Sequence, residues 1–354
     1  MITDTARLSL TAPVLHRLVA RVFEAAGAPD DIADVVASSL VQSNLRGVDS
    51  HGFIRVPDYL DYVRDGRIDP AARPIVTVAG PVVQVEGHRS FGQLAAHEAT
   101  LAAAKCARTH GIAIAVLRGA KHVGRLGEYV ELCAEEGCIG LAFANGGPRG
   151  GRVAPFGGRR RALGTNPLAY AFPVAGRSPV VADFSTSAAA EGKVRIYRDA
   201  GTPLPDGWIV NADGLPSNDP ADLYSGGALL PAAGHKGYAL GLLGEVLGGV
   251  LAGEGCASAG DDPGNGFVLF VVDAGDSFPP GAARAVSALE SIPPAEGFDR
   301  VVVPGSPELE SVRQREARGI PFSAETWLRF AAAARSVGVE VDDPVSRAEE
   351  SDDV

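Results

Sequence analysis

The chain has 354 residues, of which 46% are hydrophobic and 21% charged, enough apolar material for one large domain or two to three smaller ones. Its net charge of −11 argues against a nucleic-acid-binding surface, which needs clustered lysine and arginine, and the one basic run, 159–161, is short. No run of about 18 apolar residues, no signal-peptide pattern and no CxxC pair occurs, so we expect no membrane partner and a cytoplasmic protein with buried reduced thiols.

The first part of the chain predicts helices. Apolar residues recur at helical spacing over 12–26 and again after Asp30, which we expect to be the N-cap of a second helix. Gly47 is a natural helix end in the left-handed conformation. Pro57 can open a third helix, although a proline disfavours helical angles at the preceding residue, Val56.

Strand and helix patterns alternate from residue 75 to 184, which predicts an α/β or mixed α+β sheet domain. We expect strands at 75–78, 82–85, 112–117, 139–144, 168–172 and 180–184, and helices at 93–108 and 128–136. The hydroxyls of Ser185, Thr186 and Ser187 would cap a helix that opens over 188–194. Backbone N–H groups at such a helix start bind a pyrophosphate well.

The last part of the chain begins with a loop-rich segment, 199–235, before an apolar, glycine-bearing helix over 236–251. Strands are expected at 267–273 and 301–303, and helices at 282–291, 308–319 and 324–337. We predict a helical part, 1–74 joined by 306–340, and a sheet-rich part, 75–305. The acidic tail, 341–354, is expected to be disordered.

Two histidines are the candidate proton-transfer residues. His51 lies in the stretch Arg46–Tyr59, and His122 lies in a second short motif; both stand at loop starts among glycines and charges. Glycines let a ligand approach the backbone closely. The other histidines are expected to be structural, except His235, which lies within Gly234–Gly237 and is intermediate between the structural and the functional group.

Several cationic side chains are candidates for binding an anion. Arg46 and Arg55 could hold a substrate carboxylate, which guanidinium groups bind in a bidentate way. The alternative for both is a surface ion pair with Asp49 or Asp58. Three of the four lysines stand beside glycine motifs that suit phosphate or carboxylate contact, namely Lys121, Lys193 and Lys236.

Other chemistries lack their motifs. No metal site is expected, because His97-Glu98 does not extend to HExxH, and no GxSxG, GxxxxGK[ST] or strand–GxGxxG–helix pattern occurs. A proton donor, a carboxylate anchor and phosphate-binding loops remain. Together they fit hydride transfer to a 2-oxo acid.

The chain resembles the second malate/L-lactate dehydrogenase family from about residue 8 to 335. That family includes sulfolactate, ureidoglycolate and 2,3-diketogulonate oxidoreductases and cyclic imino-acid reductases. The matching motifs occur in the right order: Leu45–Gly52, His122–Gly124 with Gly127–Tyr129, Pro155–Gly158, Gly164–Pro167, Asp183–Ser187 and Lys236–Tyr238. The chain departs from the pattern at Phe184, where many relatives carry Met, and in the glycine-rich stretch 146–151.

The resemblance implies a homodimeric enzyme that uses NAD or NADP in a non-Rossmann sheet domain, next to a helical substrate and dimerisation domain. It implies proton transfer by His51 and His122, and substrate contacts by Ser50, Arg55 and Tyr59. It implies cofactor contacts by Thr165, Asn166, Asp183, Ser185, Thr186, Ser187, His235, Lys236 and Gly305.

We therefore expect an NAD(P)-dependent oxidoreductase that acts on a small 2-hydroxy acid or 2-oxo acid. One alternative is a reductase of a cyclic imino acid such as Δ1-piperideine-2-carboxylate, because it too presents a carboxylate beside the reacting bond. An alternative of another class is a non-catalytic protein that binds an anionic metabolite. Such a protein would keep Arg55 and the glycine loops but could dispense with both histidines.

Overall fold

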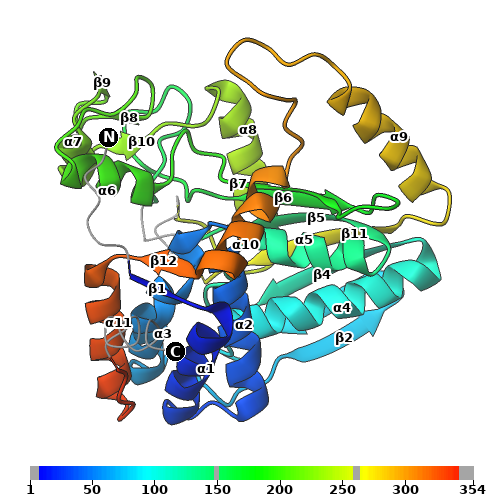
Figure 1. The fold of residues 1–354 in the computed structure, drawn as a ribbon, viewed down its shortest axis with the longest axis horizontal. Coiled ribbons are helices and arrows are strands. Elements are labelled where there is room, and N and C mark those ends of the chain that lie inside the picture. Colours follow the sequence, from blue (N-terminus) through cyan, green and yellow to red (C-terminus); the bar gives the residue numbers. More distant parts are fainter. Residues whose placement is uncertain (1–7, 147–150, 258–263, 343–354) are drawn as a thin grey trace, which may run out of the picture.

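The computed structural model describes residues 8–146, 151–257 and 264–342. Within them, a seven-stranded sheet has the order β2-β3-β4-β11-β5-β6-β7 (Figure 1). Its strands are β2 Ile75–Ala79, β3 Val82–Glu86, β4 Ile112–Arg118, β5 Cys138–Ala144, β6 Leu168–Phe172, β7 Val180–Phe184 and β11 Phe267–Asp273. Only β3 and β4 pair in parallel, whereas a Rossmann sheet is mainly parallel. The mixed α/β class predicted from the sequence is confirmed.

The helices α4 Gly92–His110 and α5 Leu126–Glu135 pack side by side on the sheet and share its core. The buried face of α4 consists mostly of alanines, which let the helix lie close to the strands, and this face includes Ala95, Ala99, Ala103 and Ala107. Because the first turn of α4 and the segment before α5 lie at the same edge of this core, residues from both can reach one site.

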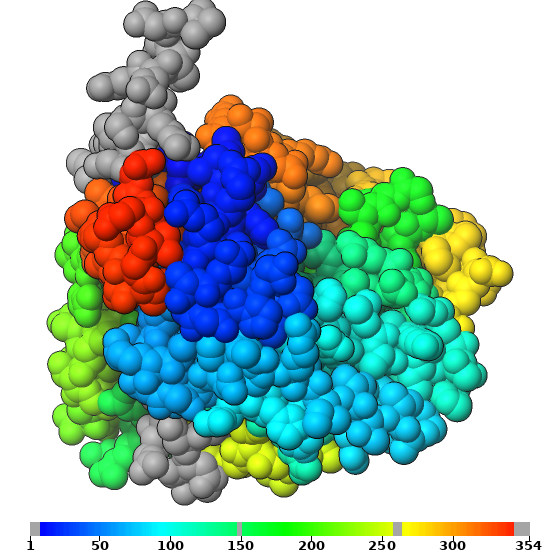
Figure 2. Space-filling model, turned by 90° about the horizontal axis from the view of Figure 1, so that it is seen from below, coloured from blue at the N-terminus to red at the C-terminus, as the bar shows by residue number. Residues whose placement is uncertain are grey.

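A second apolar core holds the helical part together. It combines α1 Ala12–Ala25, α2 Asp30–Leu45 and α3 Val56–Arg64 with the C-terminal helix α11 Ala324–Ser336. The short strands β1 Leu8–Leu10 and β12 Ile320–Phe322 pair antiparallel and close it. Figure 2 shows the N-terminal helices in blue directly beside the C-terminal helix in red. The two ends of the described chain therefore share one core.

The remaining elements follow β7 in the sequence and precede β12. A small three-stranded sheet joins β8 Ile209–Val210, β9 Pro216–Ser217 and β10 Ala228–Leu229. The helices here are α6 Glu191–Asp199, α7 Pro220–Tyr224, α8 His235–Gly244, α9 Phe278–Glu290 and α10 Ser306–Arg318. The helix α8 continues as a π-helix, η3 Glu245–Leu251. No helix among the described residues is long and apolar enough to cross a membrane.

Two expectations about helix starts were wrong. Pro29, not Asp30, is the N-cap of α2. Val56 adopts helical angles, with φ −54° and ψ −48°, as the first residue of α3. The preceding 3₁₀ turn, η2 Phe53–Arg55, leads straight into this helix, and the Val56 side chain is fully buried. Burial thus outweighs the bias that Pro57 imposes on its neighbour.

The expected helix after Ser185–Ser187 was also placed wrongly. α6 begins only at Glu191, and no side chain caps it. The Ala188 backbone N–H donates to the Leu230 carbonyl at 2.8 Å, so this segment pairs with residues 230–231 instead of opening a helix. The N–H groups expected to bind a pyrophosphate here are therefore not at a helix start.

The strand expected at 301–303 is absent from the described structure. The Ser306 N–H turns back to the Val303 carbonyl at 3.0 Å, and Pro304 has no N–H to continue a ladder. α9 begins four residues earlier than expected, at Phe278, and β1 and β12 were not foreseen. The tail that we expect to be disordered lies outside the described residues from 343 to 354. Residues 147–150 of the glycine-rich stretch 146–151 also lie outside them.

Candidate active site

The Ser50-His51 pair lies in a tight turn between α2 and α3. Gly47, with φ +79°, ends α2, and a 3₁₀ turn, η1 Asp49–His51, follows. The Asn44 side chain holds this turn from both sides: its Nδ2 donates to Asp49 Oδ1 at 2.7 Å, and its Oδ1 accepts the Phe53 N–H at 2.9 Å. A Cβ at Gly52 would overlap the Asn44 amide, so only glycine fits there.

The same turn is anchored from the far end of the chain. Arg315 on α10 binds Asp49 in a bidentate way, with Nη1–Oδ1 and Nη2–Oδ2 distances of 2.6 and 3.0 Å. Its Nη1 also donates to the Asn44 carbonyl at 2.6 Å. Sequence analysis missed Arg315, because nothing local distinguishes it from the other arginines of α10.

The two candidate histidines come together. The rings of His51 and His122 stack with centroids 5.4 Å apart and planes 22° from parallel. His51 Nδ1 lies 3.0 Å from Ser50 Oγ, and His122 Nδ1 lies 2.7 Å from Tyr59 Oη. In both rings Nδ1 is hydrogen-bonded to a hydroxyl group, so Nε2 is the nitrogen that remains available to a ligand.

Both imidazoles are uncharged at neutral pH. Burial, followed by the positive charges of Arg55 and Arg125, lowers the pKa of His51 to about 4. Burial, followed by the charges of His51 and Arg55, holds the pKa of His122 well below its ordinary value. Burial also raises the pKa of Tyr59, which therefore keeps its proton.

Arg55 lies beside the imidazoles, and only part of its guanidinium group is hydrogen-bonded within the protein. Its Nε donates to the Ser50 carbonyl at 2.6 Å, and its Nη1 pairs with Asp58 at 3.1 Å. The ion pair with Asp58 weighed in the sequence is thus present. Nη2 has no partner within the described ranges, so a carboxylate can still bind there.

Arg46, the other candidate carboxylate clamp, is used differently. Its Nη2 binds Glu131 of α5 at 2.7 Å, and both side chains are largely buried. Glu131 in turn binds Arg125 at 3.2 Å, a guanidinium that is only 4% exposed. These contacts fasten α2 to α5.

Arg125 links the two halves of the site. Its charge acts on His51 and on Asp183 of β7, whose Oδ2 accepts the Gly127 N–H at 2.7 Å. A Cβ at Gly127 would overlap the Arg125 guanidinium. Sequence analysis missed this residue, although an arginine among the glycines of the His122 motif was the same signal that pointed to Arg55.

The candidate cofactor residues of the middle of the chain form one cluster. The Thr186 N–H and Oγ1 both donate to the Thr165 carbonyl at 3.0 Å, and the Thr186 carbonyl accepts the Ala232 N–H at 2.9 Å. Ser185 Oγ and Ser187 Oγ lie 2.9 Å apart. The cluster thus joins the end of β7 to the segment before α8.

Asn166 is buried behind this cluster. Its Nδ2 donates to Glu245 Oε2 at 2.8 Å and to the Gly241 carbonyl at 2.9 Å, and its side chain is 1% exposed. Its φ of +33° is unusual for a residue other than glycine. The Asn166 side chain therefore fixes α8 against the sheet.

The start of α8 fits an anion. Gly234 precedes the helix with φ +63°, and His235 and Lys236 in its first turn are exposed. The His235 ring meets Phe156 edge-on with centroids 5.9 Å apart. Helix starts present free N–H groups and a positive dipole end, and the Lys236 ammonium adds a positive charge. The start of α8 thus combines free backbone N–H groups with a lysine side chain.

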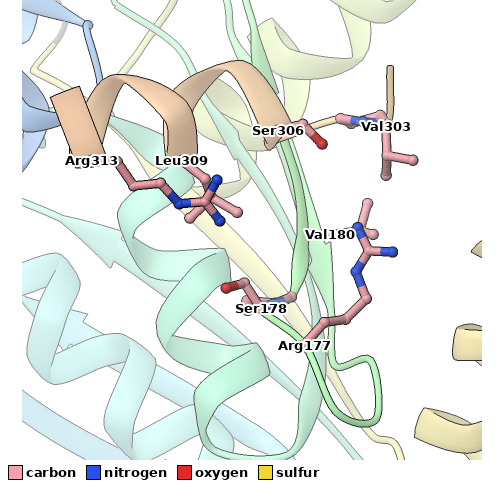
Figure 3. A pocket seen from close by; sticks show the side chains of 9 residues that line it. Arg177, Ser178, Val180, Val303, Ser306, Leu309 and Arg313 are labelled. Carbon is pink, nitrogen blue, oxygen red and sulfur yellow. The ribbon is translucent and has the colours of Figure 1, made fainter. Parts of the chain in front are cut away.

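Gly305 lies at a separate place, the start of α10. It has φ +88°, and a Cβ there would lie 3.0 Å from the Val181 carbonyl. A pocket of about 350 Å³ adjoins it, lined by the turn before β7 with Val180, by Val303 and Pro304, and by the first turns of α10 (Figure 3). Arg177 in its wall is bound by Glu290 at 2.8 and 3.0 Å, whereas Arg313 is exposed.

Comparison with known proteins identifies the family. The malate/L-lactate dehydrogenase family profile matches residues 10–331. An L-lactate dehydrogenase of Cupriavidus necator is 38% identical and covers 95% of this chain and 99% of its own. Hydroxycarboxylate dehydrogenase B of Escherichia coli K12 is 35% identical and covers 93% and 94%.

A solved structure gives the same result at the level of the fold. The crystal structure of Δ1-piperideine-2-carboxylate reductase from Pseudomonas syringae has a TM-score of 0.81 and 33% identity, and covers 92% of this chain and 99% of its own. The resemblance read from the motifs is confirmed, and the non-catalytic alternative gains no support. The chain belongs to the malate/L-lactate dehydrogenase family.

Proposed function

We propose that this dehydrogenase transfers a hydride between NAD or NADP and a small 2-hydroxy acid or 2-oxo acid. The observation that carries the proposal is the stacked pair of His51 and His122 with the Arg55 guanidinium beside it. A carboxylate anchor next to two proton-transfer groups matches a substrate whose carboxylate adjoins the reacting C–O bond.

In this proposal Arg55 and Ser50 bind the substrate carboxylate, and Tyr59 supports the site from behind. His51 exchanges a proton with the substrate oxygen, because its Nδ1 partner is the Ser50 hydroxyl, which can either donate or accept. His122 contacts the same oxygen and stabilises it. A neutral imidazole accepts the hydroxyl proton during oxidation, and an imidazolium returns it during reduction.

The cofactor, when bound, supplies or accepts the hydride. We assign its pyrophosphate to the start of α8, with Lys236 as the charged contact and His235 beside it. The hydroxyl of Ser185, which is half-buried, would receive a ribose group, whereas Ser187 is buried and its Oγ already donates to the Ala189 carbonyl at 2.8 Å. Thr165, Asn166, Thr186 and Asp183 keep this surface in shape, since their polar atoms already bind neighbouring groups. Gly305 would contact the cofactor through its backbone.

We further propose a cytoplasmic homodimer. We place its interface on α8 and η3, not on the helical part that the resemblance implied, because their outward face carries exposed apolar side chains, with exposed fractions from 37% to 61%: Leu240, Leu242, Leu243, Val246, Val250 and Leu251. Contiguous apolar surface of this kind marks an association site. Cys133 and Cys138 are buried thiols, as expected in a reducing compartment.

The second candidate function is the reduction of a cyclic imino acid. The structural likeness to Δ1-piperideine-2-carboxylate reductase favours it. Such a substrate places a C=N bond beside the carboxylate, so Arg55 and the histidines would take the same roles.

A spectrophotometric screen tests the proposal. Oxidation of NADH and NADPH is followed with a panel of 2-oxo acids and, in parallel, cyclic imino acids. Faster turnover of an oxo acid is expected. Turnover of cyclic imines alone would favour the second candidate, and saturable binding without turnover of either class would refute both.

A further inference from the structure

Two consecutive hydrogen bonds connect His122 to Tyr59 and Tyr59 to Gln93. Gln93 Nε2 donates to Tyr59 Oη at 2.7 Å, and Tyr59 Oη lies 2.7 Å from His122 Nδ1. Gln93 and Tyr59 are each 1% exposed. Gln93 lies on the first turn of α4, outside every motif that pointed to the site.

Packing fixes Gln93 in this position. The start of α4 lies against the backbone of the His122 motif so closely that a Cβ at Gly92 would overlap the Lys121 and His122 carbonyls. On the other side, a Cβ at Gly124 would lie 3.4 Å from Gln93 Cγ. The Gln93 side chain is therefore packed between the His122 motif and Tyr59.

The number of donor protons in these two hydrogen bonds determines the tautomer of His122. A tyrosine hydroxyl has one proton, and an amide Nε2 can only donate. Gln93 donates to Tyr59 Oη, and His122 Nδ1 is the other group bonded to that oxygen among the described residues, so we place the hydroxyl proton on the side of Nδ1, which then accepts it. An accepting Nδ1 carries no proton, so the neutral ring carries its proton on Nε2.

We propose that Gln93 is a positioning residue that, through Tyr59, fixes His122 as the Nε2–H tautomer. As far as catalysis is concerned, this rests on the function proposed above. His122 then offers an N–H donor to the reacting oxygen and takes up no second proton at Nδ1. The groups facing it are His51 and Arg55 from the turn and Tyr59 from α3.

Nitrogen NMR of the substrate-free protein tests the tautomer directly. ¹⁵N-histidine-labelled protein is compared with the Gln93→Met variant, which keeps the side-chain length but removes the donor; the signals are assigned with His122→Asn. We expect Nε2 of His122 to be protonated in the native protein. In Gln93→Met the Tyr59 hydroxyl can turn, so we expect a share of Nδ1–H tautomer and protonation of His122 at higher pH.

Steady-state kinetics gives the second readout. Gln93→Met should lower kcat by roughly tenfold, a fraction of a full acid–base contribution, while KM changes by less than about twofold. Thr100→Val is the matched control, because Thr100 is a buried hydrogen-bonding residue of the same helix that binds only within α4. It should change neither readout.

Two outcomes would overturn the inference. A native His122 protonated on Nδ1 would mean that Gln93 accepts from Tyr59 through Oε1. An unchanged tautomer and pKa in folded Gln93→Met would mean that Gln93 does not control the ring; if that variant does not fold, Tyr59→Phe gives the same readout. A native Nε2–H tautomer without turnover of any oxo acid or imine would refute the proposed function and leave the tautomer assignment standing.

Discussion

At the level of single residues, local context was enough to find the histidines but not their supports. His51 and His122 stand out because glycines and charges surround them in the sequence. Arg315 contacts Asp49 across 266 positions, and Gln93 contacts Tyr59 across 34. Contacts of this kind depend on how helices pack, which no local pattern records.

The lowered pKa of His51 leads to a prediction about pH dependence. The folded pKa, about 4, lies below the ordinary histidine value near 6.5, so His51 stays neutral and able to accept a proton down to acid pH. We expect kcat/KM for hydroxy-acid oxidation to remain level as pH falls through 6.5 and to decline only near 4. An NMR titration of the His51 ring should give the same midpoint. A midpoint close to 6.5 would contradict the prediction.

The lowered pKa of His51 also makes the stability of the folded protein decrease as the pH falls. Because the unfolded chain protonates this histidine first, its contribution to stability is complete above about pH 6.5 and is lost as pH falls towards 4.

The role of Arg55 predicts a binding defect. Arg55→Ala removes the guanidinium that lies beside the imidazoles, and loss of a charge-assisted hydrogen bond of about 1.5–3 kcal/mol raises KM for the acid roughly tenfold to a hundredfold. Arg55→Lys should recover only part of this loss, since an ammonium cannot bind in a bidentate way. The comparison control is Arg64→Ala on α3, an exposed arginine paired with Asp61. An unchanged KM in Arg55→Ala would count against the carboxylate anchor.

At the level of elements, the periodicity of apolar residues located most helices and strands. The elements that were predicted wrongly are those whose polar groups form other hydrogen bonds than the predicted helix or strand requires. Val301–Val303 has strand composition, but the chain turns back at Ser306 and forms no ladder. Ser187 has capping chemistry, yet its Oγ donates to the Ala189 carbonyl at 2.8 Å. No helix therefore starts at residue 188, and the pyrophosphate site that we propose lies instead at the start of α8, beside Lys236.

The link between α10 and the substrate turn can be tested by mutation. Arg315→Met removes the bidentate contact with Asp49, and because Asp49 is half exposed we expect a stability loss of only about 1 kcal/mol. Activity should fall further, by roughly tenfold or more, because a small displacement of the turn moves the reacting groups. Thermal unfolding and kcat/KM are measured side by side.

Arg318→Met is the control for this experiment, because Arg318 is an exposed arginine at the end of the same helix. Equal losses of activity in both variants would show that the contact with Asp49 is not what matters.

At the level of the whole molecule, the sequence predicted the fold class. It joined the C-terminal helices to the N-terminal ones, but nothing in it pointed to the strand pair that closes their shared core, because β1 and β12 are three-residue strands with no distinctive pattern. It also could not show which face of the apolar segment 236–251 is buried. In the structure its glycines face inward, where a Cβ at Gly244 would lie 3.1 Å from Asn166, while its leucines face outward.

That outward face predicts how the protein associates. Val250 on η3 is 61% exposed, and a charged residue in the centre of an apolar interface costs several kcal/mol because it loses its water. We expect the native protein to be a dimer in a dilution series followed by light scattering, and Val250→Asp to raise its dissociation constant by roughly a hundredfold or more. Leu328→Asp is the control, since Leu328 on α11 is 64% exposed and lies on another element. A native monomer at every concentration would refute the dimer, and a dimer that survives Val250→Asp but not Leu328→Asp would move the interface from α8–η3 to α11.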